Sequence, residues 1–205
     1  QAWFKAIQTI PGLELVGLVD LLPENIRRRA EQFELGALEQ GSDLAVVLER
    51  TRPDIVFDCT VPEAHLDITL EALRHGCHVL GEKPMADSMV NARRMVAAAA
   101  QAGKTYAVMQ NRRFMPDIRA VREYLLTGDL GALTTLNSDF YLAPHFGGFR
   151  EQMRHVLLLD MAIHTFDQAR FLSGASPVSV YCKEWNPSGS WYAHGASAVA
   201  VFEMR

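Results

Sequence analysis

Apolar positions in the first half of the chain follow two spacings in turn. The spacing of an amphipathic helix occurs in residues 2–10, 24–33, 43–50, 63–75 and 88–101. Short runs typical of buried strands lie between them, in residues 13–19, 55–59, 79–81 and 105–109. Strands that alternate with amphipathic helices predict an α/β fold with a parallel, doubly wound sheet.

After Gln110 the pattern changes. Helices are predicted at residues 117–126 and 152–172, and strands at 133–141, 178–185 and 196–202. Long, half-polar strands joined by a turn indicate an antiparallel or mixed sheet. We therefore divide the chain into an α/β domain over residues 1–110 and an α+β domain with an open mixed sheet over residues 111–205.

The stretch Val79-Leu80-Gly81-Glu82-Lys83-Pro84 carries the first chemical signal. Pro84 has no N–H group to give to a strand ladder, so Glu82 and Lys83 are expected at the carboxyl end of a parallel strand. Ligands of open α/β sheets bind at that edge. A Lys fixed there can hold its ammonium against a hydroxyl that is losing a proton. The alternative is a surface ion pair between Lys83 and Glu82.

A second signal concerns a cofactor. Dinucleotide folds place an acid at the end of a strand to accept hydrogen bonds from ribose hydroxyls, and Asp20 occupies such a place. A carboxylate there would repel the extra phosphate of NADP, so it favours NAD, with NADP as the alternative. The first strand and the Gly-rich turn of such a fold are expected to be missing, because the sequence starts too late to contain them. Asp20 could equally be a turn former at a strand end.

Asp160 and His164 lie four residues apart in a very apolar predicted helix, so they should share one face. Such a pair is either a tuned acid and base or a satisfied structural hydrogen bond. A metal site built from His145, His155, Asp160 and His164 is a weaker alternative, because the spacing matches no common metal motif. We predict no bound metal.

Composition narrows the function classes. The 205 residues are 49% hydrophobic and 21% charged, with a net charge of -4, which argues against a general nucleic-acid binder. No apolar run approaches the about 18 residues of a membrane span. The three cysteines show no C-x-x-C spacing, which predicts reduced, buried thiols in a cytoplasmic protein.

Taken together, the motifs resemble those of the glucose–fructose oxidoreductase, inositol dehydrogenase and MocA-type oxidoreductases over nearly the whole chain. They are Cys59-Thr60-Val61-Pro62 with His65, Glu82-Lys83-Pro84, Asn111-Arg112-Arg113-Phe114-x-Pro116, Gly128-x-x-Gly131 and Leu158-Leu159-Asp160-Met161-x-x-His164. The resemblance implies an N-terminal Rossmann domain, a second domain with a large open sheet, and NAD or NADP chemistry on a sugar, polyol or related hydroxy compound. It also implies a homo-oligomer, a dimer or a tetramer.

The resemblance further implies roles for individual residues. Lys83 would contact the substrate hydroxyl and the nicotinamide, His164 would exchange the proton, and Asp160 would bind substrate. The cofactor would be lined by Asp20, Thr60, Pro62, His65 and Glu82. Family members commonly have Gly-Gly where this chain has His155-Val156, and often Gly in place of Ala162, which leaves the substrate open. The family's second domain normally continues further, so we expect a sequence truncated at both ends.

Two arginines are additional substrate candidates. Arg150 and Arg113 could recognise a carboxylate, with surface charge or pairing between domains as the alternatives. Two other functions also remain open on this fold: a dinucleotide-sensing regulatory protein without catalysis, and a glycoside hydrolase that uses NAD for transient oxidation.

Overall fold

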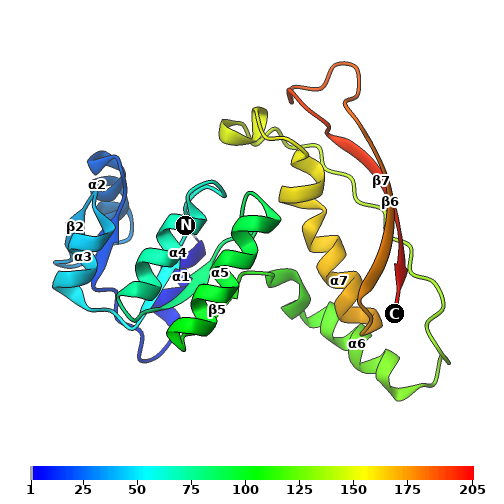
Figure 1. Cartoon of the computed structure of the whole chain (residues 1–205), viewed down its shortest axis with the longest axis horizontal. Helices are drawn as coiled ribbons and strands as arrows, with labels where there is room; N and C mark the ends of the chain where they lie inside the picture. The colour runs from blue at the N-terminus through cyan, green and yellow to red at the C-terminus, as the bar shows by residue number, and fades with distance from the viewer. Residues whose placement is uncertain (1) are drawn as a thin grey trace. The chain divides into compact units, whose positions relative to one another are not determined.

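The computed structural model describes residues 2–205 and divides them into two compact units, the first ending at Val108 and the second beginning at Met109 (Figure 1). No helix among the described residues is long and apolar enough to cross a membrane.

The first unit alternates strands and helices, as the apolar pattern predicts. Its helices are α1 (Ala2–Thr9), α2 (Pro23–Gln32), α3 (Leu44–Thr51), α4 (His65–Arg74) and α5 (Met89–Ala102). Its strands are β1 (Gly17–Val19), β2 (Glu39–Gly41), β3 (Ile55–Asp58), β4 (His78–Gly81) and β5 (Tyr106–Val108). Strands β1 and β2 pair in parallel, and β4 lies between β3 and β5 in a second parallel sheet.

Local signals account for the helix ends. Asp43 caps α3 by accepting a hydrogen bond from the Ala45 amide at 2.9 Å, and Ser88 caps α5 through the Asn91 amide at 3.2 Å. Gly103 ends α5 with a φ of 61°, a left-handed conformation that glycine adopts without a steric cost. The buried faces of these helices meet β4 in one core, which contains Leu48, Ala72, Leu73, Cys77, Val79 and Ala99.

Strand β4 presents Glu82 and Lys83 at its carboxyl end, as expected. The Glu82 amide donates to the Asp58 carbonyl at 2.9 Å, which prolongs the pairing of β3 with β4 by one residue. Pro84 then ends the run. The two side chains are half-buried at the edge where open α/β sheets bind their ligands.

The second unit combines helices with one hairpin. Its helical elements are η1 (Asn111–Phe114), α6 (Pro116–Thr127), η2 (Gly148–Glu151), η3 (Leu157–Met161) and α7 (Ile163–Ser173). Strands β6 (Pro177–Trp185) and β7 (Ser197–Met204) form an antiparallel pair, with Val180 opposite Phe202 and Tyr181 opposite Val201. Figure 1 shows α7 alongside this pair.

Several predictions for individual elements were wrong. Residues 133–141 form no strand, because their backbone pairs with no neighbouring strand. Leu136, Ser138 and Phe140 nevertheless line a cavity together with residues of α7 and β7. The helix predicted from residue 152 begins later, because His155 has a φ of 56° that a right-handed helix excludes. Strand β2 has no apolar side chain in its Glu-Gln-Gly sequence, so periodicity missed it.

The cysteines are free, as predicted, but only Cys77 is buried. Cys59 lies just beyond β3 and Cys182 on β6, and both residues are exposed. The expectation of three buried thiols was therefore wrong for two of them.

Candidate active site

The turn after β3 is fixed by a buried carboxylate. Asp58 is 2% exposed, and its Oδ1 accepts hydrogen bonds from the Thr60 amide at 3.1 Å and from the Thr60 Oγ1 at 2.6 Å. Thr60 itself is exposed at this edge of the sheet. Sequence reasoning missed Asp58, whose signal is an acid closing an apolar strand directly before the Cys-Thr motif.

Glu82 is oriented by two donors. Trp3 Nε1 donates to its Oε1 at 2.6 Å, and the Lys83 amide lies 3.3 Å from its Oε2. The Trp3 ring packs edge-on against Phe57, with the ring centroids 5.2 Å apart. These two contacts fix the position of the Glu82 carboxylate, and the choice between a cofactor contact and an ion pair with Lys83 stays a prediction.

His65 joins the two loops that frame this edge. Its ring is 1% exposed, with Nδ1 3.0 Å from the Pro84 carbonyl and Nε2 3.2 Å from the Thr60 carbonyl. Carbonyl oxygens only accept hydrogen bonds, so the ring nitrogen that carries a proton donates to the carbonyl it faces, and the buried ring lies between the two loops. Pro62 is also buried. Direct contact of either residue with a cofactor stays a prediction.

The surroundings of these loops are acidic. Burial raises the pKa of Tyr106 to about 12, and the Asp58 charge adds to that effect. Although the Cys59 residue is exposed overall, partial desolvation of its thiol raises the thiol pKa to about 12, and the charges of Glu82 and Asp58 add to the rise. The Tyr106 hydroxyl donates to the Met85 carbonyl at 3.2 Å, which ties β5 to the segment after Pro84. The charges of Glu82 and Asp58 therefore both act on the turn that follows β3.

Asp20 follows β1 and organises the next turn. Its Oδ1 accepts from the Leu22 amide at 2.9 Å and from Asn25 Nδ2 at 3.1 Å. These contacts are those of a strand-end turn former. A ribose contact through the same carboxylate stays a prediction.

Asp160 lies in a π-helical turn, which the sequence did not indicate. The Ala162 amide donates to the Leu157 carbonyl, five residues back, at 2.6 Å. Such turns are frequent at functional sites. Asp160 is 1% exposed, and Arg150 Nε donates to its Oδ2 at 2.6 Å.

The Arg150 guanidinium is held from several sides. Nη2 lies 3.5 Å from the Asp160 Oδ1, and the group sits over the Phe149 ring at 4.6 Å and the Phe146 ring at 5.7 Å. No signal in the sequence indicates the pairing of Arg150 with Asp160. Recognition of a substrate carboxylate by Arg150 stays a prediction. The arginine would bind that carboxylate while it remains hydrogen-bonded to Asp160.

His164 lies in the first turn of α7 and is 8% exposed. On the same helix, Asp167 accepts from Arg113 Nε at 2.8 Å, and the Arg113 guanidinium lies 5.4 Å from the centre of the Phe171 ring. The hydrogen bond to Asp167 raises the pKa of Arg113. Arg113 thus ties η1 to α7, and its contact with substrate stays a prediction.

The structure gathers the predicted residues into two groups, one in each unit. Thr60, His65, Glu82 and Lys83 share the carboxyl edge of β3 and β4, whereas Asp20 is on the other sheet. In the second unit, η3 and the start of α7 carry Asp160 and His164, and Arg150 contacts Asp160.

The metal alternative has no support in the described residues. His145 Nε2 lies 2.8 Å from Glu151, and His155 Nδ1 lies 2.5 Å from Glu184. Within residues 2–205, no three His, Cys, Asp or Glu side chains are grouped to hold a metal ion.

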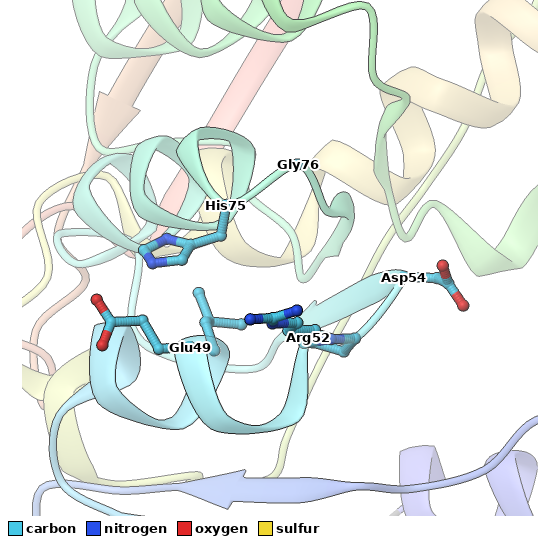
Figure 2. Close-up of a pocket in the computed structure, with 7 residues that line it drawn as sticks. Glu49, Arg52, Asp54, His75 and Gly76 are labelled. Carbon is cyan, nitrogen blue, oxygen red and sulfur yellow. The ribbon is translucent and has the colours of Figure 1, made fainter.

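A hollow of about 650 Å³ in the first unit is lined by none of the predicted residues (Figure 2). Its wall includes Glu49, Arg52, Asp54 and His75, which lie where α3 and α4 end and β3 begins. This is the amino edge of the parallel strands, opposite to the edge with Lys83. Its position argues against it as the dinucleotide site.

These features define an α/β protein whose parallel sheet carries a charged, organised carboxyl edge. Residues 1–110 match the family described as an oxidoreductase family with an NAD-binding Rossmann fold, and residues 118–204 match the GFO/IDH/MocA C-terminal domain. The chain belongs to this oxidoreductase family. The resemblance and the fold class inferred from the sequence are confirmed.

Relatives with assigned reactions are similar over most of this chain. 1,5-Anhydro-D-fructose reductase of Ensifer adhaerens is 34% identical over 180 residues, which cover 85% of this chain and 54% of the relative. D-Glucoside 3-dehydrogenase of Escherichia coli is 32% identical over 167 residues, which cover 79% of this chain and 47% of the relative. The chain spans about half the length of the curated relatives it matches.

A solved structure shares the fold. It is scyllo-inositol dehydrogenase from Lactobacillus casei with bound NAD(H) and scyllo-inositol, at a TM-score of 0.76 and 20% identity, covering 98% of this chain and 62% of that chain.

Proposed function

We propose that the protein is an oxidoreductase that transfers a hydride between NAD and a hydroxyl carbon of a sugar, a polyol or a related compound. The observation that carries the proposal is Lys83, which follows an oriented Glu82 at the carboxyl end of β4. Membership of the oxidoreductase family and the sugar-directed names of the relatives support it.

Residues from both sheets of the first unit fit part of a dinucleotide. Glu82, Thr60 and Asp20 offer oxygen acceptors and donors suited to ribose hydroxyls, and the Asp20 carboxylate would repel the 2′-phosphate of NADP. Helix α1 begins at Ala2, so the described residues contain no Gly-rich phosphate turn ahead of it. We assign cofactor binding to residues 1–110, and substrate binding and oligomerisation to residues 111–205.

In this mechanism, the chain's residues handle the substrate hydroxyl. The Lys83 ammonium donates a hydrogen bond to the hydroxyl oxygen and stabilises the alkoxide that develops there. A ring nitrogen of His164 accepts the hydroxyl proton, while Asp160 accepts a hydrogen bond from a neighbouring hydroxyl. The nicotinamide, when bound, supplies the acceptor for the hydride that leaves the same carbon. The O–H and C–H bonds break, and a carbonyl forms.

The test is nicotinamide reduction by the full-length protein, followed by absorbance. NAD and NADP are each supplied with a panel of sugars, polyols and sugar acids. We expect reduction with NAD and loss of at least about 10²-fold in rate for Lys83→Ala, with Lys104→Ala as the matched surface control. No reduction across the panel while NADH still binds would favour the sensor. Release of sugar without net NADH would favour the redox-neutral hydrolase.

The outer face of the β6–β7 pair supports a homo-oligomer. Tyr181 is 71% exposed, its cross-strand partner Val201 is 62% exposed, and Val199 is 56% exposed. A contiguous apolar surface of this kind is typical of an interface.

We expect Val201→Lys to weaken self-association by about tenfold or more, because it buries an unpaired charge between copies. Val121→Lys on α6 is the control, because Val121 is also an exposed valine, at 47%. Sedimentation measures both variants. An unchanged mass for Val201→Lys across a dilution series would rule out this face.

A further inference from the structure

The loop between β6 and β7 contacts η2, the helical turn whose Arg150 binds Asp160. The Ala193 amide donates to the Glu151 carbonyl at 2.8 Å, which joins the loop to η2. Within the loop, Asn186 Nδ2 donates to the Tyr192 carbonyl at 2.8 Å. The loop therefore has a fixed position against η2, and its aromatic residues are held with it.

Trp191 and Tyr192 of this loop form a cluster with His145, which lies just before η2. The His145 and Trp191 rings lie 4.8 Å apart at an interplanar angle of 26°, and Tyr192 meets the His145 ring edge-on at 6.3 Å. Trp191 is nevertheless 48% exposed. The cluster thus presents a large part of a rigid indole to a ligand.

Hydrogen-bonding groups lie beside the indole. His145 Nε2 is 2.8 Å from Glu151 Oε1, and both side chains are more than two-fifths exposed, at 44% and 42%. Because His145 already stacks on one face of the indole, a ligand ring would lie on the other face, and the exposed Glu151 carboxylate can accept hydrogen bonds from hydroxyl groups that extend past the indole edge. A carboxylate at this edge also disfavours phosphates and other anions.

The cluster is next to the proposed substrate residues. Glu151 follows Arg150, whose guanidinium holds Asp160 at 2.6 Å, and consecutive Cα atoms are only about 3.8 Å apart. Residues 150 and 151 of η2 therefore link the two groups: Arg150 contacts Asp160, and Glu151 contacts His145 and the loop that carries Trp191.

A pyranose ring matches this combination of groups. Its C–H faces are apolar and suit the indole face that His145 leaves open, while the hydroxyls around its rim can donate to Glu151. We propose that Trp191, His145 and Glu151 form a subsite for a second sugar ring, so that the substrate class is glycosides with at least two rings. This inference rests on the proposed oxidoreductase function for its catalytic test.

The test compares glucose, which has one ring, with cellobiose, which has two. We expect Trp191→Ala to lower the ratio of kcat/KM for cellobiose to that for glucose by about tenfold, through loss of the stacking surface. Trp191→Phe, which keeps a flat ring, should lower it by less than about threefold. Trp185→Ala is the control, because Trp185 is similarly exposed at 45% and lies on β6. An unchanged ratio in Trp191→Ala would overturn the subsite.

A binding measurement separates this proposal from the catalytic one. Cellobiose should quench the tryptophan fluorescence of the full-length protein, and Trp191→Ala should abolish the quenching while Trp185→Ala retains it. Quenching without turnover would support the subsite and contradict the oxidoreductase. Turnover without quenching, and with an unchanged kcat/KM ratio in Trp191→Ala, would support the oxidoreductase and contradict the subsite. Absence of both turnover and quenching would contradict both.

Discussion

Replacing His164 by alanine is expected to lower kcat by about 10²- to 10⁴-fold, the usual contribution of a positioned general base. The side chain is 8% exposed at the start of α7, in the unit that carries Asp160. Without the imidazole, the hydroxyl proton must pass to water. The assay is NAD reduction by the full-length protein at saturating substrate.

Two variants make this experiment specific. His75→Ala removes a histidine from the hollow at the amino edge of the first unit, and it should leave kcat within about twofold. His164→Gln keeps a hydrogen-bonding side chain that cannot accept the proton at neutral pH, so it should resemble His164→Ala. Near-normal turnover in His164→Ala would refute the assignment of this residue. Partial rescue of His164→Ala by added imidazole would support it.

Features set by neighbouring residues were predictable from the sequence. Asp43 before α3 and Gly103 after α5 have the cap roles that their residue types favour. Pro84 ends the run after β4, which located Lys83 at the carboxyl edge without any knowledge of tertiary contacts. Local chemistry is sufficient in these cases because each signal acts within about one turn of helix or one strand end.

Features set by distant contacts were not predictable. Trp3 reaches Glu82 across 79 residues, and no local pattern pairs an indole with that carboxylate. Residues 133–141 have a composition suited to a strand, but a strand also needs a partner with unpaired backbone groups. The π turn at Leu157–Met161 arises from one extra residue in the helical ladder, which an apolar periodicity does not reveal.

The Arg150–Asp160 contact belongs to this second class, and its burial gives it the largest expected effect on stability. Removing one partner of a buried ion pair leaves the other charge in a poorly solvated place, which costs about 3–5 kcal/mol when burial is complete. The Arg150 side chain is 26% exposed and Asp160 is 1% exposed, so water can reach the vacated position in part. We expect Arg150→Ala to lower the free energy of unfolding by about 2 kcal/mol.

The matched control is Arg50→Ala. Arg50 and Glu39 are also joined at 2.6 Å, but their side chains are 64% and 31% exposed. Because the N–O distance is the same in both pairs, the comparison measures what burial and the two ring contacts of Arg150 add. The exposed pair should contribute less than about 1 kcal/mol.

A double-mutant cycle with Asp160→Asn then measures the coupling between Arg150 and Asp160 directly, by urea unfolding. A coupling near 2 kcal/mol would mean that the arginine stabilises this carboxylate as an ion. Equal losses in Arg150→Ala and Arg50→Ala would instead mean that burial adds nothing. In that case, the arginine would be free to leave Asp160 for a substrate carboxylate at little cost.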